Sequence, residues 1–173
     1  VSGVGMRMAT ISERPDLPWT FRVVDDPLIN AFAVPGGFVY MTRGILAHFD
    51  SEAQMAAVIG HEIGHITARH SASQISRQQI AQVGLGVGMV LAPQLSDLAG
   101  LASAGLGVLF LRFSRDNERQ ADDLGFRYMT EAGYDPRGMV DVFEMLNRAS
   151  GGSEGRGVPA WLSTHPDPGD RQE

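Results

Sequence analysis

Two histidines four residues apart, with a glutamate directly after the first, constrain this chain more than any other feature of its sequence. They are His61 and His65, and the glutamate is Glu62. On a helix, residues at i and i+4 lie one above the other with Cβ atoms about 5–6 Å apart, so both imidazoles can reach one zinc ion at Zn–N distances of about 2.0–2.1 Å. Glu62 is offset around the helix, where it can act as a general base on a water without occupying a ligand position. The pattern predicts a helix that carries two ligands of a catalytic zinc ion.

The residues around this motif predict that it lies on a helix. Asp50 or Ser51 can cap the N-terminus, and Glu52 in the first turn interacts favourably with the helix dipole. A polar stretch from Arg69 to Gln82 extends the predicted helix to about residues 51–82. An apolar face recurs at helical spacing beside the histidines, made of Met55, Ala56, Ile59, Ile63 and Ile66. The competing interpretation is two surface histidines on an ordinary helix.

The composition limits the classes of site and partner. A chain of 173 residues is long enough to bury the core of a single domain. It has no cysteine, which excludes a disulfide scaffold and a thiolate metal site and leaves histidines and carboxylates as the strong ligands. The net charge is −6, and the 14 basic residues form no cluster. Nucleic acid is therefore not expected as a partner.

Short strands precede the motif. Residues 19–24 alternate large apolar with polar side chains. Two more apolar segments, 28–34 and 38–42, flank Pro35-Gly36-Gly37, which is typical of strands joined by a tight turn. The sequence predicts a small sheet of about three strands over residues 19–42.

An apolar segment and two more helices follow the motif. Residues 83–111 contain six glycines and a single charge, Asp97, and their two apolar runs are 10 and 14 residues long. Each run is shorter than the roughly 18–20 residues of a membrane-spanning helix. This length favours a buried helical hairpin. Two alternatives remain for the segment, a cover over the site and an element that docks on a membrane. Helices are predicted over residues 112–132 and 135–148. We expect one α+β domain over residues 1–173, mainly helical, with the small sheet before the motif helix.

A catalytic zinc site needs a third protein ligand, with the fourth position left for water. Glu118 is preferred because Asp122 follows one turn later on the same predicted helix. There it can accept a hydrogen bond from a ligand histidine and fix the tautomer of that ring. The alternative for this pair is an ordinary acidic helix face beside neighbouring arginines. The other downstream candidates are Asp123, Glu131, Glu144 and His165.

The order of the motifs resembles a known family. His61-Glu62-Ile63-Gly64-His65 followed by Arg115-Asp116-Asn117-Glu118-Arg119-Gln120-Ala121-Asp122 resembles the zinc metalloproteases of peptidase family M48, which includes Ste24 and HtpX-like enzymes and soluble periplasmic relatives. Two more segments are similar to that family: Asn30-Ala31-Phe32-Ala33 before Pro35-Gly36-Gly37, and Ser163-Thr164-His165-Pro166 before Asp170-Arg171.

The resemblance implies a zincin-like metalloprotease fold with one Zn2+ per chain, Glu118 as the third ligand and Asp122 as the carboxylate behind a ligand histidine. It implies polypeptide substrates and a periplasmic or cell-envelope location. It also implies, as possible partners, a membrane surface or proteins of outer-membrane protein assembly. The family's membrane members carry spanning helices between the two metal motifs. The broken hydrophobicity of residues 83–111 departs from that pattern and favours a soluble relative. The chain begins at Val1 without a signal peptide, so we expect a processed or trimmed product.

The expected chemistry is hydrolysis of a peptide bond. Glu62 would remove a proton from the attacking water and later protonate the leaving amine. His165 or Arg171 is the candidate donor to the oxyanion. Alternatively, His165 is a turn residue, or it occupies the water position on zinc and gives an inhibited resting state. His48 and His70 are interpreted as structural or exposed.

An extended substrate could add to the strand that contains Asn30, Ala31, Phe32 and Ala33, because strand addition satisfies backbone groups whatever the substrate's sequence. An ordinary paired core strand is the alternative. The leading function is a zinc endopeptidase that acts on unfolded or misassembled proteins. A latent, chaperone-like zinc module with a covered active site is the second, and a structural zinc domain, which has no use for Glu62, is the third.

Overall fold

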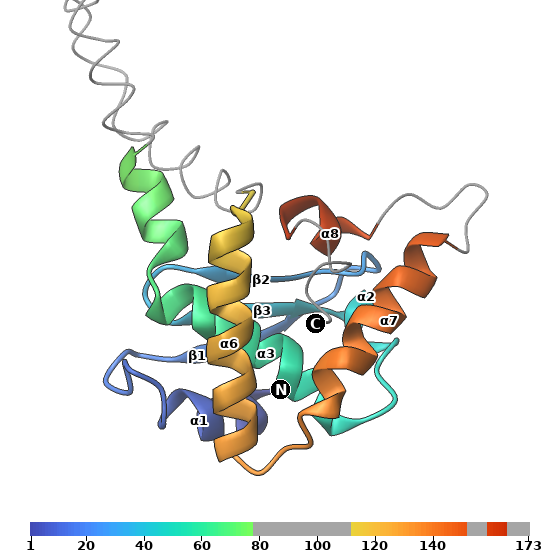
Figure 1. The fold of residues 1–173 in the computed structure, drawn as a ribbon, viewed down its shortest axis with the longest axis horizontal. Helices are drawn as coiled ribbons and strands as arrows, with labels where there is room; N and C mark the ends of the chain where they lie inside the picture. The colour runs from blue at the N-terminus through green and yellow to red at the C-terminus, as the bar shows by residue number, and fades with distance from the viewer. Residues whose placement is uncertain (78–111, 152–158, 166–173) are drawn as a thin grey trace, which may run out of the picture.

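A central helix organises the structure. The computed structural model describes residues 1–77, 112–151 and 159–165, and α3 (Glu52–Thr67) runs through their middle. The sheet lies on one side of α3, while α6 (Arg115–Glu131) and α7 (Arg137–Gly151) cover the other (Figure 1). Every α3 residue from Ala56 to Ile66 is buried. The α+β class, mainly helical with a small sheet before the motif helix, is as the sequence predicts.

Among the described residues the sheet has three strands, as expected. They are β1 (Thr20–Val24), β2 (Ala31–Val34) and β3 (Phe38–Thr42), in the order β1-β3-β2. β1 pairs with β3 in parallel, and β2 pairs with β3 antiparallel. Among the strands that the structure describes, β2 therefore lies at an edge of the sheet.

The β2–β3 hairpin turns on two glycines. Gly36 and Gly37 have φ values of 104° and 99°, which residues with a side chain rarely adopt. β2 begins later than the sequence predicts, at Ala31 rather than at Leu28. The Thr42 hydroxyl donates to the Leu28 carbonyl at 2.6 Å, so a side chain takes the place of ladder bonds there.

The motif helix begins where the capping residues predict. The Ser51 hydroxyl accepts from the Gln54 backbone N–H at 3.3 Å, and Glu52 lies in the first turn. A four-residue helix, α2 (Arg43–Leu46), precedes it. Capping thus fixes the start of α3 and the position of the two histidines along it.

The expected continuous helix over residues 51–82 is wrong: α3 ends at Thr67. The Thr67 hydroxyl donates to the Gly64 carbonyl at 3.1 Å, and the Arg69 N–H bonds to the carbonyl of Ile66, three residues back. Arg69 then has φ 59°, a left-handed conformation that no helix continues. Helical structure resumes at His70 and is described to residue 77; residues 78–82 lie outside the described residues.

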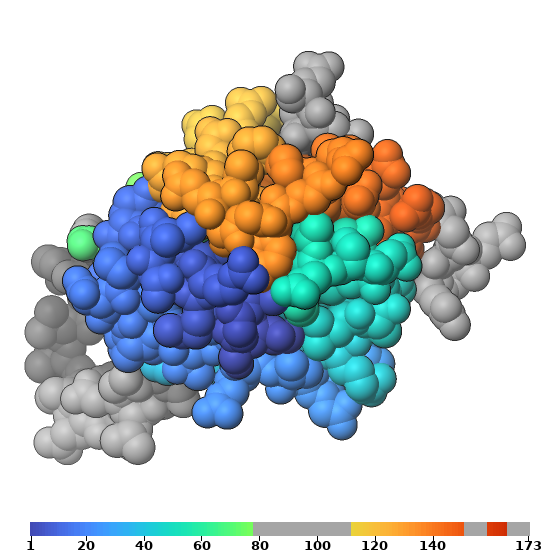
Figure 2. Space-filling view, turned by 90° about the horizontal axis from the view of Figure 1, so that it is seen from below, coloured from blue at the N-terminus to red at the C-terminus, as the bar shows by residue number. Residues whose placement is uncertain are grey.

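The later helices agree with the sequence, and two short ones were not expected. The Ser114 hydroxyl caps α6 by accepting from the Asn117 N–H at 3.2 Å. α1 (Ser2–Ala9) and α8 (Ala160–Thr164) have no counterpart in the sequence analysis. Seen from below, the dark-blue N-terminal segment lies against the orange α6–α7 region (Figure 2).

Small residues let α3 and α6 approach closely. A Cβ added at Gly64 would meet the Ala121 carbonyl oxygen at 2.8 Å, and one at Gly125 would meet the His61 backbone nitrogen at 2.7 Å. Gly60 faces Gly125 in the same seam. Only residues this small allow the two backbones to touch. The seam therefore sets how near the acidic residues of α6 come to the histidines of α3.

The apolar segment 83–111 lies outside the described residues. Within the described ranges, no helix is both long and apolar enough to cross a membrane.

Candidate metal centre

The two histidines of the motif point their Nε2 atoms at the same place. His61 Nε2 and His65 Nε2 are 2.9 Å apart, and both rings are buried. Burial keeps the pKa of His65 well below 6.5, because a charged imidazolium loses its hydration in the interior. A neutral imidazole is the form that binds a metal.

Glu118 on α6 reaches the same point. Its carboxylate oxygens lie 3.7 Å from His61 Nε2 and 3.4 Å from His65 Nε2. Burial alone would raise the pKa of Glu118. The charge and hydrogen bond of His165, the hydrogen bond from His65 and the charge of His61 outweigh burial and hold that pKa well below its ordinary value. The side chain is therefore an anion, as a ligand must be.

His165, directly after α8, supplies a fourth ligand atom, the third nitrogen of the cluster. Its Nδ1 lies 3.1 Å from Glu118 Oε1 and 3.2 Å from His61 Nε2. One ligand atom from each of His61, His65, Glu118 and His165 falls within 4.8 Å of the others. A tetrahedral zinc ion with bonds of about 2.0–2.1 Å separates its ligand atoms by about 3.3 Å. The donor types and spacings fit zinc.

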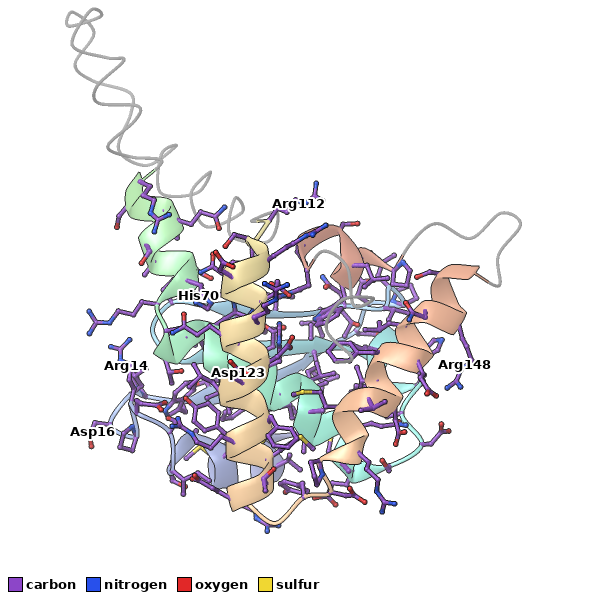
Figure 3. The ribbon with its side chains drawn as sticks, in the orientation of Figure 1. Arg14, Asp16, His70, Arg112, Asp123 and Arg148 are labelled. Atoms are coloured by element: carbon purple, nitrogen blue, oxygen red, sulfur yellow. The ribbon has the colours of Figure 1, made fainter. Side chains whose placement is uncertain are left out.

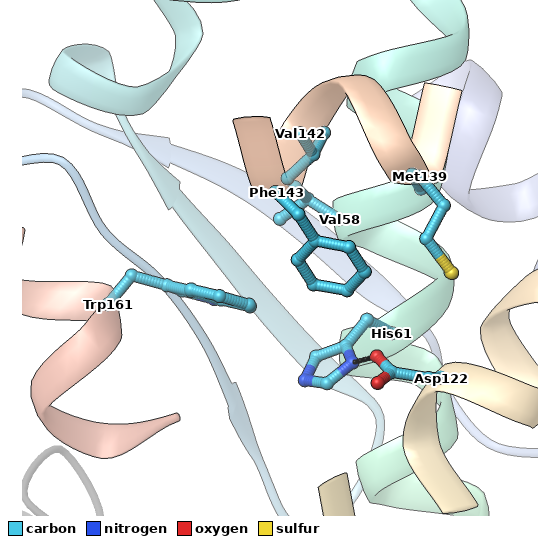
Figure 4. A pocket seen from close by; sticks show the side chains of 8 residues that line it. Val58, His61, Asp122, Met139, Val142, Phe143 and Trp161 are labelled. Atoms are coloured by element: carbon cyan, nitrogen blue, oxygen red, sulfur yellow. Dashed lines mark hydrogen bonds and ion pairs between the residues drawn. The ribbon is translucent and has the colours of Figure 1, made fainter. Parts of the chain in front are cut away.

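The ring of His61 is oriented by a carboxylate. Its Nδ1 lies 2.8 Å from Asp122 Oδ1 (Figure 4). The Nδ1–H donates to this anion, which leaves Nε2 with a lone pair directed at the cluster. Asp122 thus takes the position that the sequence proposes for it.

The ring of His65 is oriented by residues that the sequence analysis missed. His65 Nδ1 lies 3.0 Å from His70 Nδ1, and His70 Nε2 lies 3.0 Å from Gln120 Oε1 (Figure 3). When His70 Nε2–H donates to the amide oxygen, His70 Nδ1 accepts from His65 Nδ1–H, and His65 Nε2 is free for a metal. His70 is five residues beyond His65, so only the left-handed turn at Arg69 brings it back. No helical spacing rule could have found it.

The carboxylate of Glu62 faces the cluster from the side of α8. His165 Nε2 is 3.5 Å from Glu62 Oε1, and the indole N–H of Trp161 donates to the same oxygen at 3.3 Å. Trp161 also stacks on His165 with ring centroids 4.5 Å apart. Glu62, Trp161 and His165 are at most 2% exposed. Trp161, like His70 and Gln120, was not identified from the sequence as part of the site.

A narrow apolar pocket adjoins His61 on the α7 side. Phe143, Met139 and Trp161 line it, and its volume of about 10 Å³ (Figure 4) holds about one water molecule. The contacts of Trp161 and His165 with Glu62 place α8 over the Glu62 side of the cluster.

With this geometry established, comparison with known proteins places the chain. Its sequence matches peptidase family M48 over residues 1–173. This chain belongs to peptidase family M48. In this M48 domain, the buried His-His-Glu-His cluster is positioned to bind a metal, and zinc is the metal of the family's metalloproteases.

Two groups of relatives are similar to this M48 domain. The mitochondrial metalloendopeptidase OMA1 is 40% identical over 91% of the chain in Arabidopsis thaliana and 38% identical over 96% in Schizosaccharomyces pombe. The beta-barrel assembly-enhancing protease of Escherichia coli K12 is 33% identical over 99% of the chain. The chain spans 31%, 48% and 36% of the lengths of these three relatives.

The remaining predicted site residues have different outcomes. Asn30 directly precedes the edge strand β2, which contains Ala31, Phe32 and Ala33. The Asn30 Oδ1 atom is buried without a hydrogen-bond partner among the described residues. Arg171 lies outside the described residues.

Proposed function

We propose that this M48 domain is a zinc endopeptidase in which His61, His65 and Glu118 hold the metal and Glu62 is the general base. The observation that carries the proposal is one buried point on which two imidazoles and a carboxylate converge, with a second carboxylate beside it. Zinc, when bound there, would lower the pKa of a water molecule and polarise the scissile carbonyl. A structural site needs no carboxylate in the position of Glu62.

Glu62 moves the protons of the reaction. Its Oε1 accepts a proton from the attacking water, and the carboxyl group then protonates the leaving amine as the peptide bond breaks. Asp122 and His70 hold the two ligand rings in the tautomers that direct Nε2 at the metal. Arg171 remains a candidate donor to the oxyanion.

The edge of β2 is the proposed substrate strand. The Asn30 carbonyl accepts from the Thr42 N–H on β3, so strand alternation directs the backbone groups of Ala31 and Ala33 to the unpaired edge. An extended substrate can bond to those groups whatever its sequence. The unpaired oxygen of Asn30 supports this, because a buried acceptor costs free energy until a partner reaches it.

A latent state is the second candidate, and α8 favours it. His165 offers one of the ligand atoms of the cluster. The indole N–H of Trp161 donates a hydrogen bond to Glu62. The Trp161 backbone N–H also bonds to the Ile29 carbonyl at 3.2 Å, next to the proposed substrate strand. In this state His165 is a fourth ligand rather than an oxyanion donor, and α8 must move before substrate binds.

The substrates are proposed to be unfolded or misassembled polypeptides, and the location periplasmic or at the cell envelope. The E. coli relative's name, beta-barrel assembly-enhancing protease, supports a link to outer-membrane protein assembly. The plant and fission-yeast relatives are named as mitochondrial. The envelope assignment therefore depends on the bacterial relatives.

Cleavage of an unfolded protein in the presence and absence of zinc tests the proposal. Zinc-loaded protein should cleave casein at internal bonds, metal-free protein should not, and added zinc should restore cleavage. Equal cleavage with and without zinc would contradict the proposed function.

A further inference from the structure

A second pocket opens beside the metal cluster, at the opposite end of β2 from Trp161. It has a volume of about 330 Å³ and lies between the β2–β3 turn at Gly36, the end of α3 at His65 and Ile66, and the segment after α1 that carries Arg14. Arg14 lies at the edge of the molecule, on the side away from α7 (Figure 3). This pocket, which we call the arginine pocket, shares His65 with the proposed metal centre and is lined by no other proposed ligand.

Two arginines give the arginine pocket its charge. Arg14 and Arg69 both line it, and no carboxylate is among the described residues of its wall. In the described part of the chain, neither guanidinium makes an ion pair, whereas four other arginines do: Arg43, Arg127, Arg137 and Arg148. Two arginines that line one pocket, and that form no ion pair with another described residue, favour an anion there.

The backbone of Arg69 indicates that its side chain matters. Arg69 is the non-glycine residue with positive φ among those the structure describes. Glycine and asparagine adopt this conformation with less strain. Backbone strain of this kind concentrates at functional sites. An arginine in this position supports a function for the guanidinium at the pocket wall.

The position of the arginine pocket along β2 indicates which part of a substrate reaches it. β2 runs from Ala31 toward Val34 and the turn at Gly36, where the pocket lies. A substrate that adds antiparallel to β2 therefore has its N-terminal side at the pocket. The free C-terminal carboxylate of a substrate would lie at the other end, toward Trp161.

We propose that the arginine pocket binds the carboxylate side chain of an aspartate or glutamate on the N-terminal side of the scissile bond. The proposal rests on the proposed peptidase function and on antiparallel strand addition. A carboxylate can form two parallel hydrogen bonds with a guanidinium group. Acidic side chains would therefore help to determine which substrates are cleaved.

Matched peptides test it. Pairs of peptides with amidated C-termini differ by glutamate or glutamine at one of the four positions before the scissile bond, and each position is tested in turn. Cleavage of each peptide by zinc-loaded protein is measured. We expect kcat/KM to be about tenfold higher for glutamate at one or more of these positions, as a charge-assisted bond provides. Cleavage with no preference between glutamate and glutamine would overturn the proposal and leave the peptidase function intact.

Variants assign the preference to the pocket. Arg69→Asn removes the charge, and Arg69→Asp reverses it, while both residues tolerate the left-handed backbone. The glutamate preference should disappear in Arg69→Asn and Arg14→Gln, and lysine-containing peptides should be favoured in Arg69→Asp. Arg148→Gln, an exposed arginine on α7, is the control and should keep the preference. A preference unchanged in the Arg14 and Arg69 variants would overturn the assignment.

Binding gives a readout that does not depend on cleavage. Zinc-loaded Glu62→Gln protein is titrated with fluorescent forms of the glutamate and glutamine peptides. Tighter binding of the glutamate peptide, lost in Arg69→Asn, supports the pocket even if no peptide is cleaved, in which case the proposed function alone fails. Equal affinity for both peptides overturns the pocket.

Discussion

His70 Nδ1 lies 3.0 Å from Nδ1 of His65, which makes one histidine the partner that orients another. His61 has a carboxylate in the corresponding position, Asp122 at 2.8 Å. The two proposed zinc ligands on α3 are therefore held by different chemistry. The His65 side depends on a neutral ring in one tautomer, fixed in turn by Gln120.

Replacement of His70 should weaken zinc binding. We expect His70→Phe to lower zinc affinity about 10- to 100-fold, the usual cost of removing a group that orients a ligand. His70→Asn, whose carbonyl can accept from the His65 ring, should retain more affinity than His70→Phe. Competition with a chromophoric chelator measures this.

The ¹⁵N chemical shifts of the ring nitrogens show whether His70 fixes the tautomer of His65 or only packs against it. In zinc-loaded protein, ¹⁵N NMR should show His65 protonated at Nδ1 and His70 protonated at Nε2. A His65 ring protonated at Nε2 would contradict the proposed relay, because that nitrogen could not then bind the metal.

A methyl group in the α3–α6 seam should separate the ligands. Gly125→Ala places a Cβ at 2.7 Å from the His61 backbone nitrogen, so one helix must shift at a cost of about 1–3 kcal/mol. We expect a lower Tm and weaker zinc binding. Gly3→Ala, where nothing lies within 4 Å, is the control. Zinc binding equal in both variants would show that the seam does not set the site.

His165→Ala distinguishes the two roles considered for that residue. If His165 closes the resting site, its removal should leave zinc bound by three ligands and increase casein cleavage severalfold. If it is the oxyanion donor, cleavage should fall by about 10²-fold or more. Initial rates at equal zinc occupancy measure the direction, and the cluster geometry predicts an increase.

Zinc should stay bound as the solution becomes mildly acidic. Protons compete with the metal for His65 Nε2, and burial holds the pKa of His65 well below 6.5; the low pKa of Glu118 acts in the same direction. Zinc release on acidification should therefore have its midpoint well below pH 6.5. A midpoint at or above pH 6.5, measured by dialysis and metal analysis, would contradict the buried neutral site.

Local sequence signals predicted the part of the site that depends on one helix at a time. The His61–His65 spacing, the Ser51 cap and the Glu118–Asp122 spacing each follow from helix periodicity. The approach of α6 to α3 does not, because it depends on glycines that meet only after folding. Gly64 and Gly125 carry that information, but a single sequence shows them as poor helix formers.

The residues that the sequence did not reveal depend on a backbone turn or on a short helix. His70 reaches His65 because Arg69 is left-handed, which no propensity assigns to arginine. Trp161 lies on α8, which is five residues long and too short for a periodic pattern to indicate. Tertiary contacts place both.

The most direct test of the account compares the wild-type protein with Glu62→Gln, both also in a His165→Ala background so that a closed resting site cannot hide activity. Glu144→Gln, an exposed glutamate on α7, is the control. We expect one zinc per chain in every protein. Casein cleavage should be at least about 10²-fold lower for Glu62→Gln, and the Glu144→Gln control should not show this loss. Equal cleavage by wild-type and Glu62→Gln protein would contradict the proposed role of Glu62 and with it the proposed mechanism.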